Sequence, residues 1–494
     1  MAHSVSLANL AFLPEAVAWP RYDHGRLRAG ILHIGVGNFH RAHQAMYLDD
    51  LLNRGRDHDW AIIGAGVRQS DAAMRQALER QDWLTTVVEL EPGANRARIS
   101  GSMIDFVPVS DDGQAIVARL DDPAIRIVSL TVTEGGYCID PATSAFNLDH
   151  PEIRYDAAHM DMPRGVFGVL LAALKRRRDR ALAPFTIMSC DNILHNGRVT
   201  MEAVAGLADL VDRSLAAYVR EAVAFPSSMV DRITPATTDR ERTLLEERFG
   251  IADNWPVFCE PFRQWALEDH FPAGRPALEE VGVTFTPQVA AFELMKLRIL
   301  NGGHAAIAYP AGLLGIHFVH EAMADPLVRG FLDKLETDEI IPQVPPVPGI
   351  DLADYYLLIA NRFANPDVGD TIPRLAQDGS NRQPKFILPS TRDRLRSGAD
   401  VAGLALESAL WCRYCAGRCE TGEAFLLDDP NAERLTPAAL AAKDDPGAFL
   451  ALRDIFGDIA DSQLFRARFA TALDSLWRDG TRATLQRYLS GDLA

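Results

Sequence analysis

The sequence is poor in cysteine and has no long hydrophobic run. Six cysteines among 494 residues are too few for the disulfide framework of a small secreted domain. No run of about 18 apolar residues is present, so no transmembrane helix is expected. Residues 1–20 lack a basic segment ahead of their short apolar stretch, which argues against a secretory signal peptide. These absences favour a cytoplasmic protein without membrane attachment.

Positive charge is also scarce. The chain has 50 lysines and arginines against 67 aspartates and glutamates, a formal net charge of −17. Nucleic acids and anionic membranes are bound by concentrated basic surface. The composition therefore excludes a general affinity for either, although it still allows a local basic pocket for one small anion.

Three of the cysteines, Cys412, Cys415 and Cys419, lie close together in LWCRYCAGRCE. Thiols at such spacing can bind a metal, but a fourth ligand and flanking Gly/Pro turns are missing. The surrounding residues have the pattern of an amphipathic helix, where cysteine is a common small core residue. We therefore predict that these cysteines are packing residues and that no metal is bound.

Short β-rich runs alternate with helical patterns over the first half of the chain. The strand candidates are residues 31–36, 60–67, 84–90, 125–133 and 185–189. Such alternation predicts parallel crossovers and a Rossmann-like, doubly wound α/β sheet. After Pro287 helical patterns dominate. We therefore predict a dinucleotide-binding α/β domain over residues 1–287 and a mainly α-helical substrate and catalytic domain over residues 288–494.

The segment RAGILHIGVGNFHRAH contains a glycine-rich turn. It places Gly35 and Gly37 between the first strand and a helix beginning near Phe39, where main-chain N–H groups can receive a pyrophosphate. The third glycine of the usual dinucleotide fingerprint is replaced by His40. The motif alone is also compatible with an ordinary turn, and its position after the first strand is what favours a cofactor site.

The second strand is followed by Arg68, Ser70 and Asp71 in WAIIGAGVRQSDAAM. An acidic side chain here accepts hydrogen bonds from the adenosine ribose and repels a 2′-phosphate, so Asp71 favours NAD. Arg68 and Ser70 are residue types that accommodate a phosphate, which leaves NADP tolerance open. Asp71 is also a candidate N-cap of the helix that follows, a role that can coexist with ribose binding.

Polar residues also follow the later strands. Glu134 comes after the fourth strand in TVTEGGYC, and Asp191 and Asn192 come after the fifth in MSCDNILHNG. Asp231 precedes a turn in SSMVDRITP. Each could be a simple cap. Because open α/β sheets bind ligands at the carboxyl ends of their strands, the repetition favours a binding site.

A helical pattern in ELMKLRILNGGHAAIAY is interrupted by Lys296, Asn301 and His304. In a regular α-helix Asn301 lies about 140° and His304 about 80° around the axis from Lys296. Gly302 and Gly303 would have to loosen the helix for the three to converge. A buried lysine has a lowered pKa and is a candidate general base, while Asn and His can hold an oxygen that gains charge. The alternative is a solvated helix face.

Taken together, these segments resemble one enzyme family. From about residue 30 to about residue 390 the chain carries, in order, HIGVGNFHRAH, TEGGYCID, SCDN, VDRITP, ELMK with LNGGH, VPGIDL and QDGSNRQPKF. This series resembles the polyol-specific long-chain dehydrogenase/reductase family, of the mannitol 2-dehydrogenase type. The resemblance implies NAD-dependent, metal-independent interconversion of a polyol and its 2-ketose by a monomeric enzyme.

The resemblance also implies roles for individual residues. Lys296 resembles the catalytic general base, and Asn192 and Asn301 resemble the amides that stabilise the alkoxide. His304 resembles a substrate-hydroxyl contact that orients the reacting oxygen. Glu134 resembles the gate through which the lysine exchanges its proton with solvent.

Further residues resemble the binding positions of the family. Cofactor contacts are implied for Gly35, Gly37, Asn38, Phe39, Asp71, Val230 and Asp231. Substrate contacts are implied for Arg374, Lys385, His304 and Asp231. The polyol is expected between the two domains.

Two other functions remain open at this point. One is a sugar-acid oxidoreductase of the fructuronate or tagaturonate type, in which Arg374 and Arg382 would bind the substrate carboxylate. The other is a non-catalytic NAD-binding regulator, which would have no need of a base such as Lys296. The preferred polyol, whether mannitol, arabitol or sorbitol, is also left open.

Overall fold

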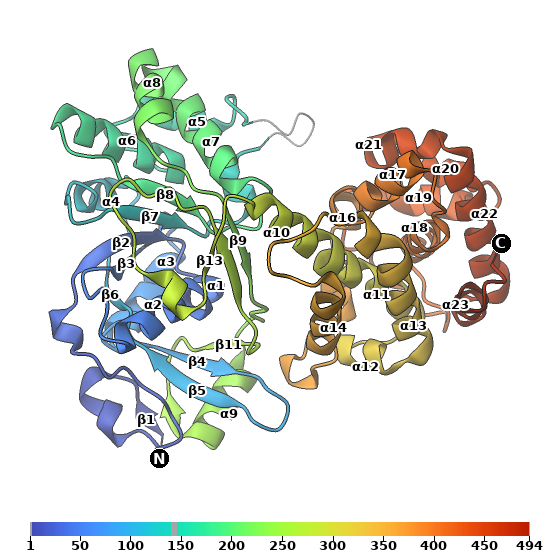
Figure 1. Cartoon of the computed structure of the whole chain (residues 1–494), viewed down its shortest axis with the longest axis horizontal. Helices are drawn as coiled ribbons and strands as arrows, with labels where there is room; N and C mark the ends of the chain where they lie inside the picture. The colour runs from blue at the N-terminus through green and yellow to red at the C-terminus, as the bar shows by residue number, and fades with distance from the viewer. Residues whose placement is uncertain (1, 140–145, 494) are drawn as a thin grey trace. The chain divides into compact units, whose positions relative to one another are not determined.

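The computed structural model describes residues 2–139 and 146–493 and contains two compact units, Met1–Ala290 and Ala291–Ala494 (Figure 1). The first unit is built on a five-stranded sheet in the order β6-β3-β2-β7-β8, in which every neighbouring pair is parallel. The predicted Rossmann-like sheet is therefore confirmed. Its strands are β2 (Ala29–Ile34), β3 (Ala61–Ala65), β6 (Met103–Phe106), β7 (Ile127–Leu130) and β8 (Thr186–Ser189).

Helices cover both faces of this sheet, which explains why its strands are apolar almost throughout. On β2, Leu32 and Ile34 enter a core formed with α4, α6, α7 and α8, whereas Ile31 enters a second core formed with α2. Successive strand residues thus serve opposite faces. The helices of this unit are α1 (Asn38–Ala42), α2 (Gln44–Asn53), α3 (Asp71–Glu79), α4 (Gln114–Arg119), α5 (Pro151–Ala158), α6 (Val166–Asp179), α7 (Asn196–Val211), α8 (Arg213–Ala222) and α9 (Asp239–Phe249).

The prediction that segment 84–90 belongs to the main sheet is wrong. Its strand, β4 (Thr85–Glu89), pairs antiparallel with β5 (Arg96–Ser100) and parallel with β11 (Val257–Cys259) in a separate sheet. The short connection through Pro92 and Gly93 is a turn signal. A turn of this length joins antiparallel neighbours, whereas a parallel crossover needs a dozen or more residues. Strand β6 takes the edge position instead.

Two further small sheets complete the first unit. Strands β13 (Thr284–Phe285), β12 (Gln264–Leu267) and β9 (Ser228–Asp231) form one, and β1 (His3–Ser4) pairs with β10 (Ile251–Ala252) in the other. The segment that carries Asp231 therefore lies outside the parallel sheet.

The second unit is helical, and no strand is formed anywhere in its described residues, 291–493. It is entered through α10 (Val289–Met295), which continues into a π-helical turn, η5 (Lys296–Asn301), and then into α11 (Gly302–Leu313). The remaining helices are α12 (Val319–Ala324), α13 (Pro326–Leu335), the π-helical turn η6 (Glu336–Ile340), α14 (Leu352–Phe363), α15 (Ile372–Ala376), α16 (Gly379–Phe386), α17 (Leu388–Ser397), α18 (Ala402–Cys415), α19 (Ala432–Ala441), α20 (Gly447–Leu450), α21 (Arg453–Phe456), α22 (Gln463–Asp479) and α23 (Thr481–Ser490).

The grouped cysteines lie in the core of this second unit. Cys412 and Cys415 are buried within α18, and burial raises the pKa of both thiols well above the usual value. Cys419 is buried just beyond the helix, with its Sγ atom 2.9 Å from Thr421 Oγ1. Among the described residues, no group of three or more His, Cys, Asp or Glu side chains is placed to hold a metal ion.

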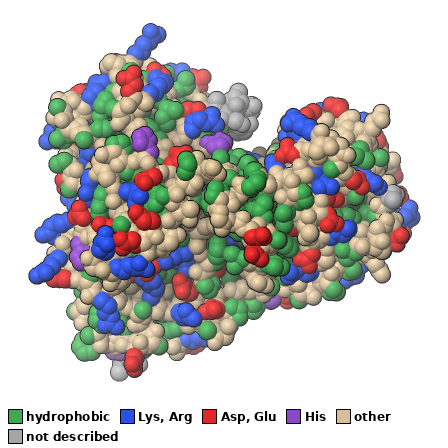
Figure 2. Space-filling model, in the orientation of Figure 1, with side chains coloured by type: hydrophobic (Ala, Val, Ile, Leu, Met, Phe, Trp, Pro, Cys, Tyr) green, Lys and Arg blue, Asp and Glu red, His purple; other side chains and the backbone are tan. Residues whose placement is uncertain are grey.

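In the part of the chain that the structure describes, no helix combines the length and the apolar character needed to cross a membrane. On the face drawn in Figure 2, basic and acidic side chains are intermingled.

Candidate functional site

The glycine-rich turn follows β2 at a point where only glycine fits. Gly35 has φ +98°, and a Cβ atom there would lie 2.1 Å from the carbonyl oxygen of Thr131, at the end of β7. The hydroxyl of Thr131 donates to the Gly35 carbonyl at 2.6 Å, and Gly37 N–H donates to the same carbonyl at 2.7 Å. The close approach of β7 therefore fixes both the residue type and the shape of this turn.

A pair of stacked histidines explains why the third fingerprint glycine is missing. His40, on α1, stacks on His33, on β2, with ring centroids 3.4 Å apart and an interplanar angle of 12°. His33 is held by Ser129 Oγ at 2.8 Å and by Thr131 Oγ1 at 2.9 Å. In the usual fingerprint the third glycine allows close helix–strand packing. Here two flat rings fill that contact, and burial lowers the pKa of His33 to about 3, so its ring is neutral.

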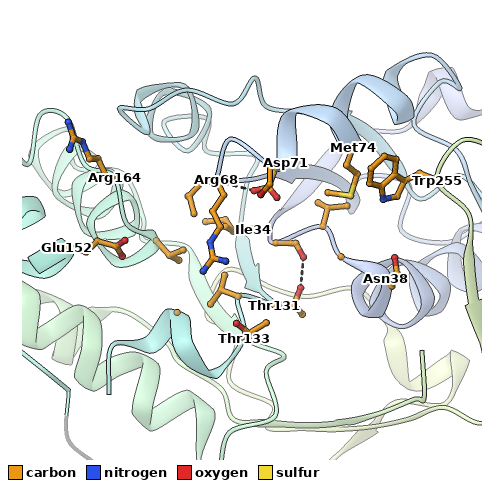
Figure 3. Close-up of a pocket in the computed structure, with 18 residues that line it drawn as sticks. Ile34, Asn38, Arg68, Asp71, Met74, Thr131, Thr133, Glu152, Arg164 and Trp255 are labelled. Carbon is orange, nitrogen blue, oxygen red and sulfur yellow. Dashed lines mark hydrogen bonds between the residues drawn. The ribbon is translucent and has the colours of Figure 1, made fainter. Parts of the chain in front are cut away.

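A pocket of about 390 Å³ opens beside this turn (Figure 3). The predicted cofactor residues Gly35, Gly37, Asn38 and Asp71 are among those that line it. Phe39 lies outside this lining, and its ring stacks on His43 with centroids 4.8 Å apart. Other side chains of the wall carry no signal in the sequence, and they include Met74, Thr131, Thr133, Glu152, Arg164 and Trp255.

Asp71 and Arg68 define one side of the pocket. Asp71 is the first residue of α3 and Ser70 precedes it, so the N-cap interpretation of Asp71 is wrong. Asp71 Oδ2 accepts from the main-chain N–H of Arg68 at 3.2 Å. Gly66 leaves room for this carboxylate, because a Cβ atom there would lie 2.3 Å from Asp71 Oδ2. Figure 3 shows the guanidinium of Arg68 reaching across the pocket towards Thr131 and Thr133.

The ends of β7 and β8 are tied together by Asp191. Its Oδ1 accepts from the N–H of Thr133 at 2.8 Å, and its Oδ2 accepts from the N–H of Val132 at 3.1 Å and from the Tyr137 hydroxyl at 2.9 Å. Thr133 has φ +66°, a strained conformation for a β-branched residue. Asp191 therefore holds the strained turn that leads into Glu134.

Two of the predicted catalytic residues follow these strands. Asn192 is exposed directly after Asp191. The main chain of Glu134 begins the 3₁₀ helix η3 (Glu134–Tyr137), and its side chain lies outside the described part of the structure. Sequence reasoning identified both positions but gave Asp191 no role in placing them.

The start of β9 contacts the end of β8 from another sheet. Ser228 Oγ donates to the carbonyl of Ser189, the last residue of β8, at 2.6 Å. Val230 and Asp231 follow on β9 and are both buried. This contact brings Ser228, at the start of β9, to the end of β8, whereas Asp231 lies at the other end of β9.

A π-helical turn, η5, lies in the segment that carries Lys296, Asn301 and His304. The segment is helical, as predicted, but η5 (Lys296–Asn301) is a π-helical turn rather than a regular α-helical one. In a π-helix the backbone bond runs from i to i+5, so Asn301 stands one turn from Lys296. Asn301, the last residue of η5, and His304, on α11, are three residues apart. Gly302 itself keeps ordinary helical angles, φ −62° and ψ −44°.

Lys296 and His304 are largely desolvated. Lys296 is only 9 % exposed, and the imidazole of His304 stacks on Phe363 with ring centroids 4.3 Å apart. Burial lowers the pKa of His304 to about 3, an effect that Asp370 opposes and that Arg374, Arg362 and Arg382 reinforce. His304 is therefore a neutral ring at physiological pH. Within the described residues, its Nε2 atom and Asn301 Oδ1 have no hydrogen-bond partner.

The predicted substrate residues of the second unit lie on α15 and α16. Arg374, on α15, is exposed and forms a two-point ion pair with Asp370. Lys385 is exposed in the last turn of α16. Arg382 donates to the carbonyl of Leu375 at 2.8 Å, so its guanidinium helps to end α15. Sequence reasoning missed Asp370, although its i, i+4 spacing to Arg374 was a readable signal.

Models of two protein domains match the chain. The mannitol dehydrogenase Rossmann domain matches residues 29–280, and the mannitol dehydrogenase C-terminal domain matches residues 288–477.

Full-length relatives match the same regions. Mannitol 2-dehydrogenase of Cereibacter sphaeroides is 57% identical over 478 residues, which are 97% of this chain and 100% of that protein. A solved structure of Pseudomonas fluorescens mannitol 2-dehydrogenase, in ternary complex with NAD and D-mannitol, is 42% identical, with a TM-score of 0.88 over 99% of this chain and 100% of the other. The structure of a D-sorbitol dehydrogenase in substrate-free form is 33% identical, with a TM-score of 0.90 over 97% of this chain and 100% of the other.

Proposed function

This chain belongs to the mannitol dehydrogenase family, and we propose that it is an NAD-dependent oxidoreductase that interconverts a polyol, such as mannitol, and its 2-ketose. The observation that carries the proposal is the 57% identity to a mannitol 2-dehydrogenase over that relative's whole length. The named substrates of the solved relatives, D-mannitol and D-sorbitol, are both polyols. The π-helical turn adds physical support, because π-turns inside α-helices occur frequently at functional sites.

The first unit fits a dinucleotide. The turn at Gly35 lets the main chain approach a pyrophosphate closely, and Asp71 lines the same pocket as an acceptor for ribose hydroxyls. When bound, the nicotinamide supplies the hydride acceptor. Arg68 also faces this pocket, and it would offset the repulsion between Asp71 and a 2′-phosphate. We therefore expect NAD to be preferred and NADP to be tolerated weakly.

We propose that Lys296 takes the proton of the substrate hydroxyl. A lysine at 9 % exposure is a stronger candidate for this role than a solvated one, because desolvation favours its neutral form. Asn192 and Asn301 would donate hydrogen bonds to the alkoxide, a contribution of about 3 kcal/mol per donor in comparable sites. His304 is neutral and would orient the same oxygen. Glu134 would pass the proton of Lys296 on to solvent.

The remaining substrate contacts are proposed on the same basis. Arg374 and Lys385, both exposed in the second unit, would bind distal hydroxyls of the polyol. Val230 and Asp231 would stand beside the nicotinamide.

A substrate panel tests the function. The purified chain is mixed with NAD or NADP and with D-mannitol, D-sorbitol, D-arabitol or D-mannonate, and formation of the reduced cofactor is followed. We expect turnover of at least one polyol, with NAD favoured over NADP. Turnover of mannonate alone would support a sugar-acid oxidoreductase instead. Cofactor binding without any turnover would support a non-catalytic regulator.

A further inference from the structure

An ion pair in the second unit is placed where the substrate is proposed to bind. Arg374 Nε donates to Asp370 Oδ1 at 2.5 Å, and Arg374 Nη2 donates to Asp370 Oδ2. Asp370 Oδ1 also accepts from the N–H of Thr371 at 2.8 Å. The Asp370 side chain is 10% exposed and that of Arg374 is 52% exposed. The carboxylate of Asp370 is thus largely buried, and the guanidinium of Arg374 is exposed to solvent.

Asp370 is held rigidly from both sides. Its carbonyl accepts from the N–H of Val319, at the start of α12, at 3.0 Å. On its other side, Phe318 and Thr371 form a β-bridge, and the N–H of Ile372 donates to the carbonyl of His317 at 2.8 Å. The carboxylate therefore has a fixed place from which to orient Arg374.

The surroundings of Asp370 are basic. His304 comes from α11. Three arginines, Arg362 from α14, Arg374 from α15 and Arg382 from α16, act on its ionisation together with Asp370. Burial raises the pKa of the Asp370 carboxyl, but the hydrogen bond and charge of Arg374 outweigh this and leave it below its usual value. Asp370 is therefore ionised at neutral pH and offsets positive charge beside His304.

We propose that Asp370 is a positioning residue that reserves the substrate site for uncharged polyols by holding and neutralising Arg374. This inference rests on the proposed function, in which Arg374 binds a distal part of the substrate. The pair uses two of the five N–H donors of the guanidinium, so a polyol hydroxyl can still accept from the others. A substrate carboxylate would compete with Asp370 for the same two-point contact and would meet its negative charge.

Substitution of Asp370 by asparagine removes the charge and keeps the size. The test compares kcat/KM for D-mannitol and for D-mannonate, which has a carboxylate in place of one terminal CH2OH group. In Asp370→Asn we expect the mannonate-to-mannitol ratio to rise at least about tenfold, mainly through a lower KM for mannonate. Asp370→Glu should keep the wild-type ratio, and the double variant Asp370→Asn/Arg374→Gln should lose the gain.

The matched control is Asp458→Asn, which removes one partner of the surface ion pair between Arg392 and Asp458. This variant should leave the ratio unchanged. Asp370→Ser serves as a second neutral variant if Asp370→Asn does not fold. An unchanged ratio in the neutral variants would overturn the inference, and so would a gain that persists without Arg374.

Binding provides a readout that does not depend on turnover. Calorimetry with the NADH-loaded protein should show mannonate binding at least about tenfold tighter in Asp370→Asn than in the wild type. If the wild type is inactive with every polyol, the proposed function fails, and unchanged mannonate binding then also rejects the role of Asp370. If the wild type is active and neither the ratio nor the binding changes, the inference alone fails.

Discussion

At the scale of single residues, the clearest constraint is the close approach of two strand ends at Gly35. The residue needs both a positive φ and the absence of a side chain, since a Cβ atom would lie 2.1 Å from the carbonyl oxygen of Thr131. Gly55 offers a matched comparison. It also has positive φ, +75°, but a Cβ atom there would meet nothing within 4 Å.

We predict that Gly35→Ala lowers the stability of the protein by about 3 kcal/mol or more, because it adds a main-chain clash to the cost of an alanine at positive φ. Gly55→Ala should cost only about 1 kcal/mol, the conformational term alone. Thermal unfolding of the two variants measures the difference, and NAD binding should weaken only in Gly35→Ala. Equal shifts in the unfolding midpoint would show that crowding at Gly35 has no effect.

The site residues that could be predicted from the sequence are those marked by a short motif or by their distance from a predicted strand. Gly35 and Asp71 each follow a predicted strand closely in the sequence, and both line the pocket. Asp191 was visible at a strand end, but its bonds to Thr133 and Tyr137 join segments more than 50 residues apart. No periodicity in one sequence encodes such a contact.

At the scale of elements, the π-helical turn η5 is the feature that changes the spacing of the proposed catalytic groups along the helix. The pattern of apolar and polar residues in one sequence does not reveal a π-turn, because π-turns and α-helices contain the same types of side chain. Sequence reasoning therefore assigned the alignment to Gly302 and Gly303. In the structure both glycines are helical. Gly303 faces Phe363 and Glu336, where a Cβ atom would lie 3.3 Å and 3.4 Å from side-chain atoms.

We predict different effects for alanine at these two glycines. Gly302→Ala should stabilise the protein by about 0.5–1 kcal/mol through helix propensity, since its Cβ atom would meet only ordinary contacts, 3.5 Å or longer. Gly303→Ala should stabilise the protein less than Gly302→Ala does, or should destabilise it, because the side chain of Phe363 must shift. Phe363 stacks on His304, so KM for the polyol should rise in Gly303→Ala alone. Thermal unfolding and steady-state kinetics separate the two, and equal behaviour would contradict this account.

Strand prediction succeeded where burial on both faces produced continuous apolar runs, as in β2 and β7. It failed for β4 because that strand is also largely buried but pairs through a turn at Pro92-Gly93. Pairing partners are decided by connection length and by tertiary contact, not by the composition of a strand.

At the scale of the whole molecule, buried neutral histidines link folding to pH. Burial lowers the pKa of His33 and of His43, both in the first unit, to about 3. An unfolded histidine has its ordinary pKa near 6.5, so between pH 6.5 and 3 the unfolded chain binds more protons than the folded chain. Stability therefore falls as the pH drops through this window.

We predict a loss of about 2 kcal/mol per buried imidazole between pH 7 and pH 5. Calorimetry should show the transition of the first unit moving down by roughly 10 °C. Glu407, in the second unit, acts in the opposite sense, because burial raises its pKa to about 8 and its neutral form is favoured at lower pH. A first-unit midpoint that does not change between pH 7 and pH 5 would contradict the assignment of neutral buried rings.

The most direct test of the proposed function is the turnover of Lys296→Met, a substitution that keeps an unbranched side chain but removes the amine. Lys334→Met is the matched control, because Lys334 belongs to a solvent-exposed ion pair with Asp338 in the same unit. We predict that Lys296→Met lowers kcat for polyol oxidation by about a thousandfold or more, while NADH binding and the unfolding temperature remain close to those of the wild type. Turnover of Lys296→Met within a few fold of the Lys334→Met control would contradict the assignment of Lys296 as the general base.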